Sequence, residues 1–146
     1  CKKQEYSVGS FTCKRNPEGG IINWSQSTIQ IYNKIRALTS PYPGAFTFYK
    51  NRKMIIWDAQ PINNPPKYVG RIPGRVVKIL LNEGSVEVLT GDGIIKIKMI
   101  QYGDKQVTKA TEVIKSIRAR LGVSTEDLMA KIQSLEKNNN FLKDEK

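Results

Sequence analysis

Three short apolar runs separated by tight turns are the feature that most constrains the fold of this sequence. The runs are RVVKILL, SVEVLT and IIKIKMI, and the linkers NEG and GDG between them are typical of hairpin turns. In the last run Ile95, Ile97 and Met99 alternate with Lys96 and Lys98, which is the period of a strand with one buried face. Residues 75–100 therefore predict three consecutive antiparallel strands, with the isoleucines and Met99 facing a core.

Two more β-rich runs, AFTFYK and KMIIWD, precede these strands and meet at KNRK, which predicts a hairpin with a basic tip. Lys50, Arg52 and Lys53 would protrude there. The next stretch, AQPINNPPKYVGRIPG, contains four prolines, so we expect a surface loop that carries Lys67 and Arg71. Five strands at this spacing predict a small closed barrel.

A helix is expected ahead of the strands, in the stretch IINWSQSTIQIYNKIRAL. Ser25 is a suitable N-cap, and Trp24 before it can pack as a hydrophobic staple on Ile29. Pro41 disfavours helical backbone at the preceding residue and ends the helix, and the Pro-Gly pair at 43–44 then turns the chain into the first strand. The helical face predicted to be core consists of Ile31, Ile35 and Leu38.

Two helices are expected after the strands. TKATEVIKSIRARLG, residues 108–122, has apolar residues at helical spacing and ends at Gly122, a typical residue after a helix C-terminus. Ser124 with Asp127 resembles a capping box that starts the second helix, and Val123 can staple onto its first apolar residue. The apolar seam of that helix would be Leu128, Ile132 and Leu135.

The charge of the chain is strongly positive and unevenly placed. The sequence has 24 Lys and Arg against 13 Asp and Glu, a net charge of +11. Residues 19–82 hold nine of the basic residues and one acidic residue, Asp58, which gives this stretch a net charge of +8. A basic, solvated surface is one explanation, but the local excess favours an anionic partner, with nucleic acid first and phosphorylated small molecules second.

Several kinds of chemistry find no support in the sequence. It contains no histidine, and its two cysteines, Cys1 and Cys13, lack the spacing of a zinc site or a disulfide framework. The GDG at 91–93 is too short for a phosphate-binding loop, and we interpret it as a turn. We therefore expect no metal and no catalysis by this chain alone. No apolar run is long enough to span a membrane, so we expect a cytoplasmic protein.

Several of these motifs together resemble one known family. The stretch KRNPEGGIINWS, a helix ending in IRAL, the corner PYPGAF, and then IIWDA and VLTGDGIIKI follow one another in this order. In order and spacing they are similar to the C-terminal domain of the methionyl-tRNA formyltransferase family, the 10-formyltetrahydrofolate-dependent formyltransferases. The resemblance covers most of residues 11–117.

The resemblance implies a mainly β fold with flanking helices: an open, OB-like five-stranded barrel preceded by one helix and followed by two. Residues 1–18 would be an interdomain linker, residues 19–122 the formyltransferase C-terminal domain, and residues 123–146 a helical extension. The parent enzyme would transfer a formyl group from 10-formyltetrahydrofolate to an amine, in an N-terminal catalytic domain outside this sequence. The cofactor and every catalytic residue would belong to that domain.

The partners that the resemblance implies are tRNA, initiator methionyl-tRNA above all, and the N-terminal catalytic domain of the same parent chain. Two of the proposed tRNA-binding residues match the family's linker and one matches its helix, and the others are the basic residues of the hairpin and the loop. The predicted nucleic-acid-binding residues are Lys14, Arg15, Arg36, Lys50, Arg52, Lys53, Lys67 and Arg71.

Two alternatives remain open at the level of sequence. The stretch QYGDKQ keeps one lysine where the family commonly has Gly-Lys-Lys, and the C-terminal extension is long for a tRNA-directed member. Amino-sugar formyltransferases share this domain, so the chain can also be read as a packing or dimerisation module of a nucleotide-amino-sugar N-formyltransferase. The other alternative is an independent nucleic-acid-binding barrel without an attached enzyme.

Overall fold

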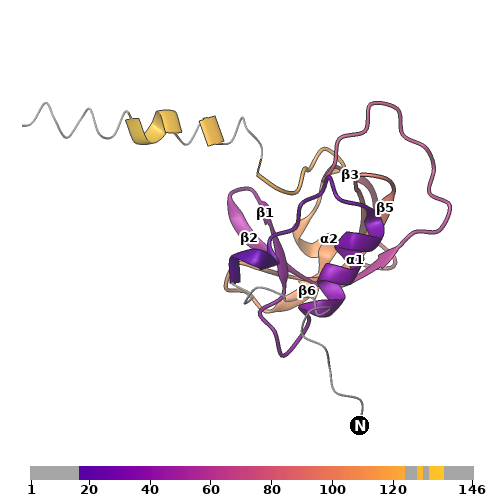
Figure 1. The fold of residues 1–146 in the computed structure, drawn as a ribbon, viewed down its shortest axis with the longest axis horizontal. Coiled ribbons are helices and arrows are strands. Elements are labelled where there is room, and N and C mark those ends of the chain that lie inside the picture. Colours follow the sequence, from indigo (N-terminus) through magenta and orange to yellow (C-terminus); the bar gives the residue numbers. More distant parts are fainter. Residues whose placement is uncertain (1–16, 124–127, 130–131, 137–146) are drawn as a thin grey trace, which may run out of the picture.

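A single curved antiparallel sheet forms the centre of the molecule (Figure 1). The computed structural model describes residues 17–123, 128–129 and 132–136. The strands follow the order β1-β2-β5-β4-β3, and a short β6 pairs with β5. Their bounds are β1 Ala45–Tyr49, β2 Arg52–Pro61, β3 Val76–Leu80, β4 Ser85–Leu89, β5 Ile94–Tyr102 and β6 Val107–Lys109. The five predicted strands are confirmed, and β6 is an addition to them.

Helix α1 (Thr28–Ala37) precedes the sheet, and its N-cap lies two residues after the predicted N-cap at Ser25. Its N-cap is Ser27, which forms a capping box with Gln30 because each side chain bonds the other residue's backbone amide. Ile29 is 54% exposed, so the predicted staple from Trp24 onto Ile29 is wrong. The predicted core face is confirmed, since Ile31 and Ile35 are buried.

The corner between α1 and β1 is as predicted. The helix ends at Ala37, and β1 begins at Ala45 after the two prolines. Gly44 has a φ of +84°, and a Cβ at this position would collide with Ile55 of β2. Lys50 and Asn51 both have positive φ, 48° and 61°, as a two-residue hairpin turn requires. The sequence thus places the basic residues of this hairpin correctly at its tip.

Strands β2 and β5 are the longest pair, and a bulge in β2 changes which side chains reach the core. Ile56 lies opposite Ile100, but the register then shifts so that Asp58 lies opposite Met99. Ile95, Ile97 and Ile100 are fully buried, whereas Met99 is only half-buried. The prediction that Met99 faces the core is therefore only partly confirmed, because the alternation of inward and outward side chains does not continue through the register shift.

The sheet is not closed into a barrel by its strands, which corrects the prediction of a closed barrel. Its edge strands are β1 and β3, and they do not pair with each other. The segment Ala119–Gly122 lies between them: the amide of Val76 donates to the carbonyl of Ala119 at 2.9 Å, and the amide of Gly122 donates to the carbonyl of Phe48 at 2.8 Å. We call residues 119–122 the bridging segment, because their backbone hydrogen-bonds to both edges of the sheet.

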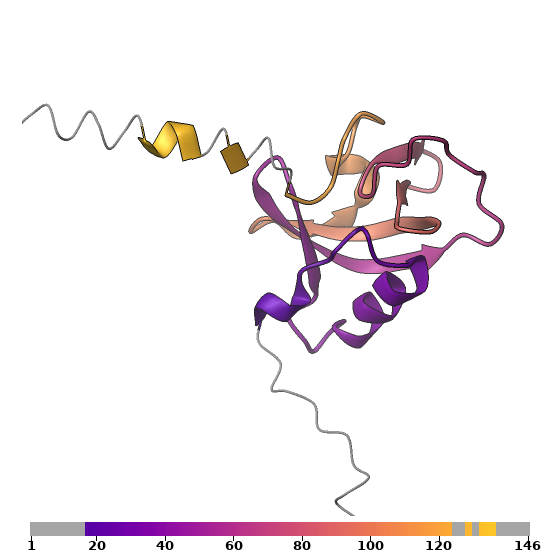
Figure 2. The same ribbon diagram turned by 45° about the horizontal axis from the view of Figure 1, so that its top comes forward.

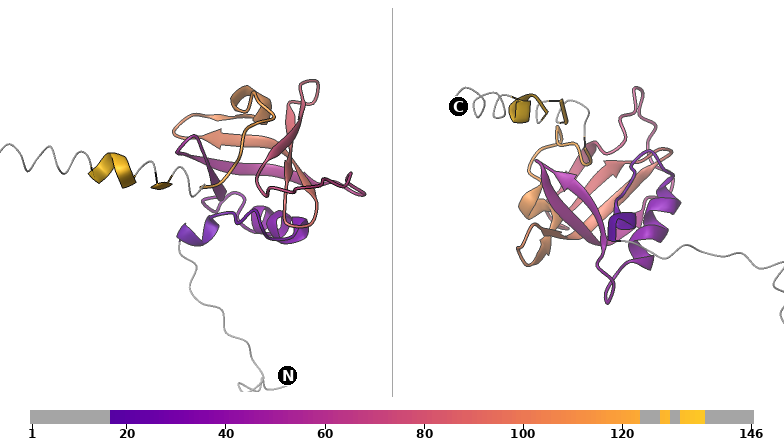
Figure 3. Two further views of the ribbon diagram at one scale, coloured as in Figure 1. Left: turned by 90° about the horizontal axis from the view of Figure 1, so that it is seen from above. Right: turned by 60° about the vertical axis from the view of Figure 1, so that its left-hand side comes forward.

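The bridging segment also explains why the predicted helix over 108–122 is wrong. Helix α2 is only Ala110–Val113, and it lies on the opposite side of the curved sheet from α1 (Figure 3). The chain then leaves the helix, turns at residues 117–118 and reaches the edge strands, which offer hydrogen bonds that a helix could not use. The described residues after it, 128–129 and 132–136, are helical, and the capping residues predicted at 124–127 lie outside the described residues.

Trp24 packs under the bridging segment. Its indole is buried, and its Nε1 donates to the hydroxyl of Thr47, also buried, at 2.9 Å. A Cβ added at Gly74 or at Gly122 would lie 3.3 Å from the indole, so the backbone of both glycines touches the ring. Core packing of Trp24 is confirmed, although its partners are two glycines and not the predicted Ile29.

The GDG turn holds the start of α1. Oδ1 of Asp92 accepts hydrogen bonds from the amide of Thr28 at 2.7 Å and from its hydroxyl at 2.9 Å. The bond from the Thr28 amide is the main reason that the pKa of Asp92 lies below its usual range. A protein carboxylate thus occupies the helix N-terminus where an external anion would bind, so the interpretation of GDG as a structural turn is confirmed.

Replacing Gly74 by alanine should weaken the bridging segment. Gly74 has a φ of +86°, and a Cβ there would collide with the carbonyl oxygen of Leu121. Gly70, in the same loop, has a φ of +66° and open space around a Cβ, so Gly70→Ala is the matched control for backbone strain. We expect Gly74→Ala to lower the free energy of unfolding by about 2 kcal/mol more than Gly70→Ala, in urea denaturation. Equal losses of unfolding free energy in the two variants would contradict the close packing of Gly74 against Leu121.

The Asp92 carboxylate should make stability depend on pH. Because its folded-state pKa is lowered, its contribution is present above the ordinary aspartate pKa of about 3.9 and is lost as the pH falls through the lowered value. We expect Asp92→Asn to cost roughly 0.5–1 kcal/mol at pH 7, since the site is exposed to solvent, and progressively less at acidic pH. Urea denaturation of Asp104→Asn serves as control, and a pH-independent cost at Asp92 would contradict the account.

Candidate nucleic-acid interface

The basic tip of the β1–β2 hairpin presents its charges beside aromatic rings. Nζ of Lys50 lies 5.4 Å from the centroid of the Tyr49 ring, and Nζ of Lys53 lies 4.3 Å from that of Phe46. Such cation–π contacts orient an ammonium group while it stays exposed. Arg52 is exposed between these two lysines. The three predicted hairpin residues therefore form one cluster, which we call the hairpin cluster.

The other predicted site residues lie elsewhere. Arg36 is exposed near the end of α1, with its guanidinium 5.4 Å from the centroid of the Tyr32 ring. Lys67 is exposed in the loop between β2 and β3, and Arg71 in the same loop is half-buried. Figures 1 and 2 show this loop and the hairpin tip at opposite ends of the sheet. Lys14 and Arg15 lie outside the described residues.

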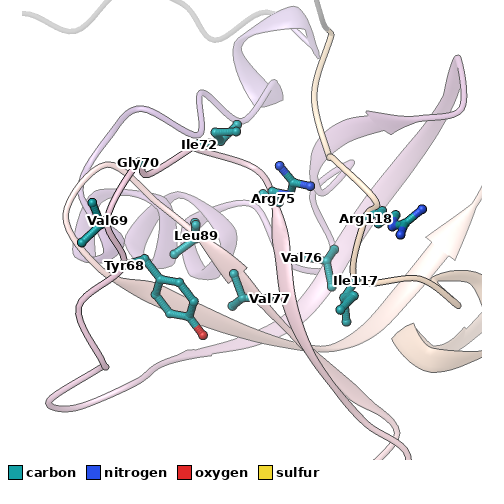
Figure 4. Close-up of a pocket in the computed structure, with 10 residues that line it drawn as sticks. All are labelled: Tyr68, Val69, Gly70, Ile72, Arg75, Val76, Val77, Leu89, Ile117 and Arg118. Carbon is teal, nitrogen blue, oxygen red and sulfur yellow. The ribbon is translucent and has the colours of Figure 1, made fainter.

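A pocket of about 420 Å³ opens between the β2–β3 loop and the chain just before the bridging segment (Figure 4). Tyr68 lies on one side of it, and Ile117 and Arg118 lie on the other, with Arg75 between them and Ile72. The apolar residues Val76 and Leu89 are buried beneath. Its lining combines one aromatic ring, several aliphatic side chains and two guanidinium groups, and it contains no acidic residue.

Two arginines face each other beside this pocket. Arg75, just ahead of β3, and Arg120, in the bridging segment, are partners in an isolated antiparallel bridge. The hydrogen bonds that define the bridge join the flanking residues: Val76 to Ala119, and Leu121 to Gly74 at 2.7 Å. In this type of pair the two Cα atoms are only about 4.5 Å apart and the side chains are close, so like charges oppose each other directly.

No acidic side chain neutralises this arginine pair within the described part of the chain. The one ion pair found there joins Lys96 to Glu83 at 2.9 Å, where the lysine lowers the pKa of the glutamate. Arg118, which lines the pocket, also has no ion pair among the described residues. Two like charges held together without a counterion are unfavourable in the free protein and attract an anion.

The bridging segment connects the arginine pair to the hairpin cluster. Gly122 donates to Phe48, and Phe48 lies opposite Lys53 in the β1–β2 register. In Figures 1 and 2 the orange segment after α2 passes between the β2–β3 loop and the hairpin. The loop, Arg75, Arg120 and the hairpin cluster therefore follow one another along a single side of the fold, which we call the basic edge.

Sequence reasoning missed Arg75, Arg118 and Arg120. Arg118 and Arg120 fall within the predicted helix, where they would point to solvent on opposite sides. The signal that could have found them is the alternation of R-A-R-L, polar then apolar, just before a glycine, which also fits an extended segment. Only the contact with the edge strands selects the extended form.

Other kinds of site find no support in the described residues. Residues 17–123, 128–129 and 132–136 contain no group of three metal-ligating acidic, Cys or His side chains. Within the same ranges, no helix is both long and apolar enough to cross a membrane. The basic edge and its pocket are therefore the candidate ligand-binding features of the described surface.

A family model described as the formyl transferase C-terminal domain matches residues 14–118, which is most of the chain. The chain belongs to the formyl transferase C-terminal domain family. The match includes the hairpin cluster and the residues that line the pocket, and it stops just before the bridging segment, so Arg120 lies outside it. The resemblance expected from the sequence motifs is thereby confirmed at the level of the formyltransferase domain.

Solved structures of HypX from Aquifex aeolicus show the same fold. HypX in complex with tetrahydrofolic acid is 21% identical, with a TM-score of 0.58 over 71% of this chain. A variant of HypX with two phenylalanine substitutions gives 20% identity and a TM-score of 0.56, also over 71% of this chain. The formyltransferase C-terminal domain described here spans only 18% of the HypX chain in both cases.

Proposed function

We propose that this formyltransferase C-terminal domain belongs to a methionyl-tRNA formyltransferase and helps to position the tRNA. The observation that carries the proposal is the basic edge: cationic side chains from the hairpin, the loop and the bridging segment follow one side of the fold. No acidic partner neutralises them within the described residues. Phosphate groups of an RNA backbone are the anions that such an extended row of charges fits best.

The chemistry of formyl transfer would belong to the rest of the parent protein. The described residues of this domain hold no histidine and no cluster of acid–base groups, so they offer no general base near neutral pH. HypX was crystallised with tetrahydrofolic acid. We extend this to the parent of the present domain, in which an N-terminal catalytic domain would transfer the formyl group of 10-formyltetrahydrofolate to methionyl-tRNA.

A second role, as a packing or dimerisation module of a nucleotide-amino-sugar N-formyltransferase, is favoured by the C-terminal extension. Leu128, Ile132 and Leu135 each have helical backbone, and their spacing of i, i+4 and i+7 is that of one helical face. All three are about half exposed. An apolar helical face that is left exposed is typical of a surface that packs against another chain.

The hairpin cluster should be needed for tRNA binding. We expect a Lys50, Arg52 and Lys53 triple glutamine variant to weaken tRNA binding at low salt and to reduce the slope of log affinity against log salt by about three, since each lost phosphate contact removes about one. The matched control neutralises three exposed lysines outside the basic edge: Lys78, Lys109 and Lys115.

Binding is measured by fluorescence anisotropy with labelled tRNA, after circular dichroism shows that both variants fold. Equal losses in the two variants would mean that net charge alone attracts tRNA, and the proposal would be wrong. No binding of tRNA by the unmodified chain at low salt, together with self-association in analytical ultracentrifugation, would favour the packing role instead.

A further inference from the structure

We propose that the pocket beside Arg75 binds one unpaired ribonucleotide of an RNA strand, with the phosphate on the arginine pair and the base against Tyr68. The proposal deepens the proposed function, because it rests on RNA as the partner of the basic edge. It assigns a separate task to this pocket: the hairpin cluster would hold backbone charge, whereas the pocket would accept a nucleotide that has left the duplex.

The phosphate half of the site follows from the bridge between Arg75 and Arg120. Their guanidinium groups start from directly opposed backbone positions, and Arg118 lies two residues before Arg120 at the rim of the pocket. Arginine binds phosphate oxygens through two parallel hydrogen bonds, and a shared anion would remove the repulsion within the pair. Two backbone hydrogen bonds, from Val76 to Ala119 and from Leu121 to Gly74, fix both backbones, so the pair is built before any ligand arrives.

The base half of the site follows from the remaining lining. The phenol ring of Tyr68 faces the pocket from the loop side, and Ile117, which is 58% exposed, faces it from the other side (Figure 4). Pockets for ligands of nucleotide size occupy about 300–1,000 Å³, and this one measures about 420 Å³. A flat base stacked on Tyr68 would cover apolar side chains that otherwise remain in water.

The combination of an arginine pair with an aromatic and aliphatic lining favours an unpaired nucleotide over other anions. A free phosphate would use the arginines but leave Tyr68 and Ile117 exposed, and an acidic peptide lacks the flat apolar surface that the pocket accepts. A nucleotide in a duplex cannot enter, because its base is stacked between its neighbours. Single-stranded RNA offers both a splayed base and an adjacent phosphate.

The direct test is a titration of the chain, labelled with ¹³C in its methyl groups, with a six-nucleotide oligoadenylate at low salt. We expect the methyl signals of Val77 and Ile117 to shift, and those of Ile35, on the buried face of α1, to stay in place. An RNA duplex of the same length, with blunt ends, should leave all these signals unchanged. Shifts confined to methyl groups outside the pocket would overturn the proposal.

Two substitutions at Tyr68 isolate the stacking contact. Tyr68→Ala should weaken oligoadenylate binding about tenfold, because loss of one aromatic platform removes the stacking of one base. Tyr68→Phe keeps the ring and should bind within about twofold of the unmodified chain. Equal weakening by both substitutions would point to a hydrogen bond from the hydroxyl, and the stacking arrangement would then be wrong.

The arginine pair is tested with Arg75→Gln and Arg120→Gln combined. We expect this double variant to reduce the salt slope of oligoadenylate binding by about 0.7, the value for one phosphate of a single strand, and the charge-matched Lys105→Gln and Lys115→Gln control to leave it nearly unchanged. Arg120→Gln alone should raise the Tm of the chain without RNA at low salt, since it removes the repulsion from Arg75. A fall in Tm would mean that the pair stabilises the fold and is not a ligand site.

The outcomes separate this proposal from the proposed function. If tRNA binding depends on the hairpin cluster while oligoadenylate shifts no pocket methyl group, the pocket proposal is wrong and the tRNA role stands. If the methyl signals of the pocket shift but the affinity for tRNA does not depend on the hairpin cluster, the tRNA role is wrong and the nucleotide site stands. Binding of AMP as tightly as the oligoadenylate would overturn the assignment to an RNA strand in favour of a free mononucleotide.

Discussion

Four residues of non-helical backbone hold the two edges of this sheet together. The bridging segment hydrogen-bonds to Gly74 and Val76 on one edge and to Phe48 on the other. Without it, the amide of Val76 and the carbonyl of Phe48 would lose their hydrogen-bond partners, and the core would be open on that side. The same backbone carries Arg120 to a position opposite Arg75. Closing the core and placing Arg120 opposite Arg75 therefore have one physical cause.

The bridging segment in turn depends on two glycines and one tryptophan. The indole of Trp24 fills the space beneath Gly74 and Gly122, and its hydrogen bond to Thr47 fixes the ring to β1. Side chains at either glycine would push the segment away from the sheet. The arginines of this formyltransferase domain therefore start from packed backbone, so binding an anion would cost the conformational entropy of their side chains but little of their backbone.

The strands could be predicted from the sequence because their signals are local. Alternation of apolar and charged residues defines β5, and the turn at Lys50 and Asn51 follows from its two residues. The extended form of residues 119–122 could not be predicted, since Ile117 and Leu121 also fit a helical period and the deciding hydrogen bonds come from strands distant in the sequence. The hairpin cluster was therefore within reach of sequence reasoning, but the pocket and the arginine pair were not.

Amide hydrogen exchange at Leu121 and Gly122 tests the central claim most directly. If their amides bond to Gly74 and Phe48 as described, both should be protected to about the same degree as the amides of β5 in the centre of the sheet, because they open only when the core opens. The amide of Arg120 has no hydrogen-bond acceptor among the described residues, so it should exchange much faster and serves as the internal reference. Rapid exchange at all three positions would contradict a segment that holds the sheet edges together.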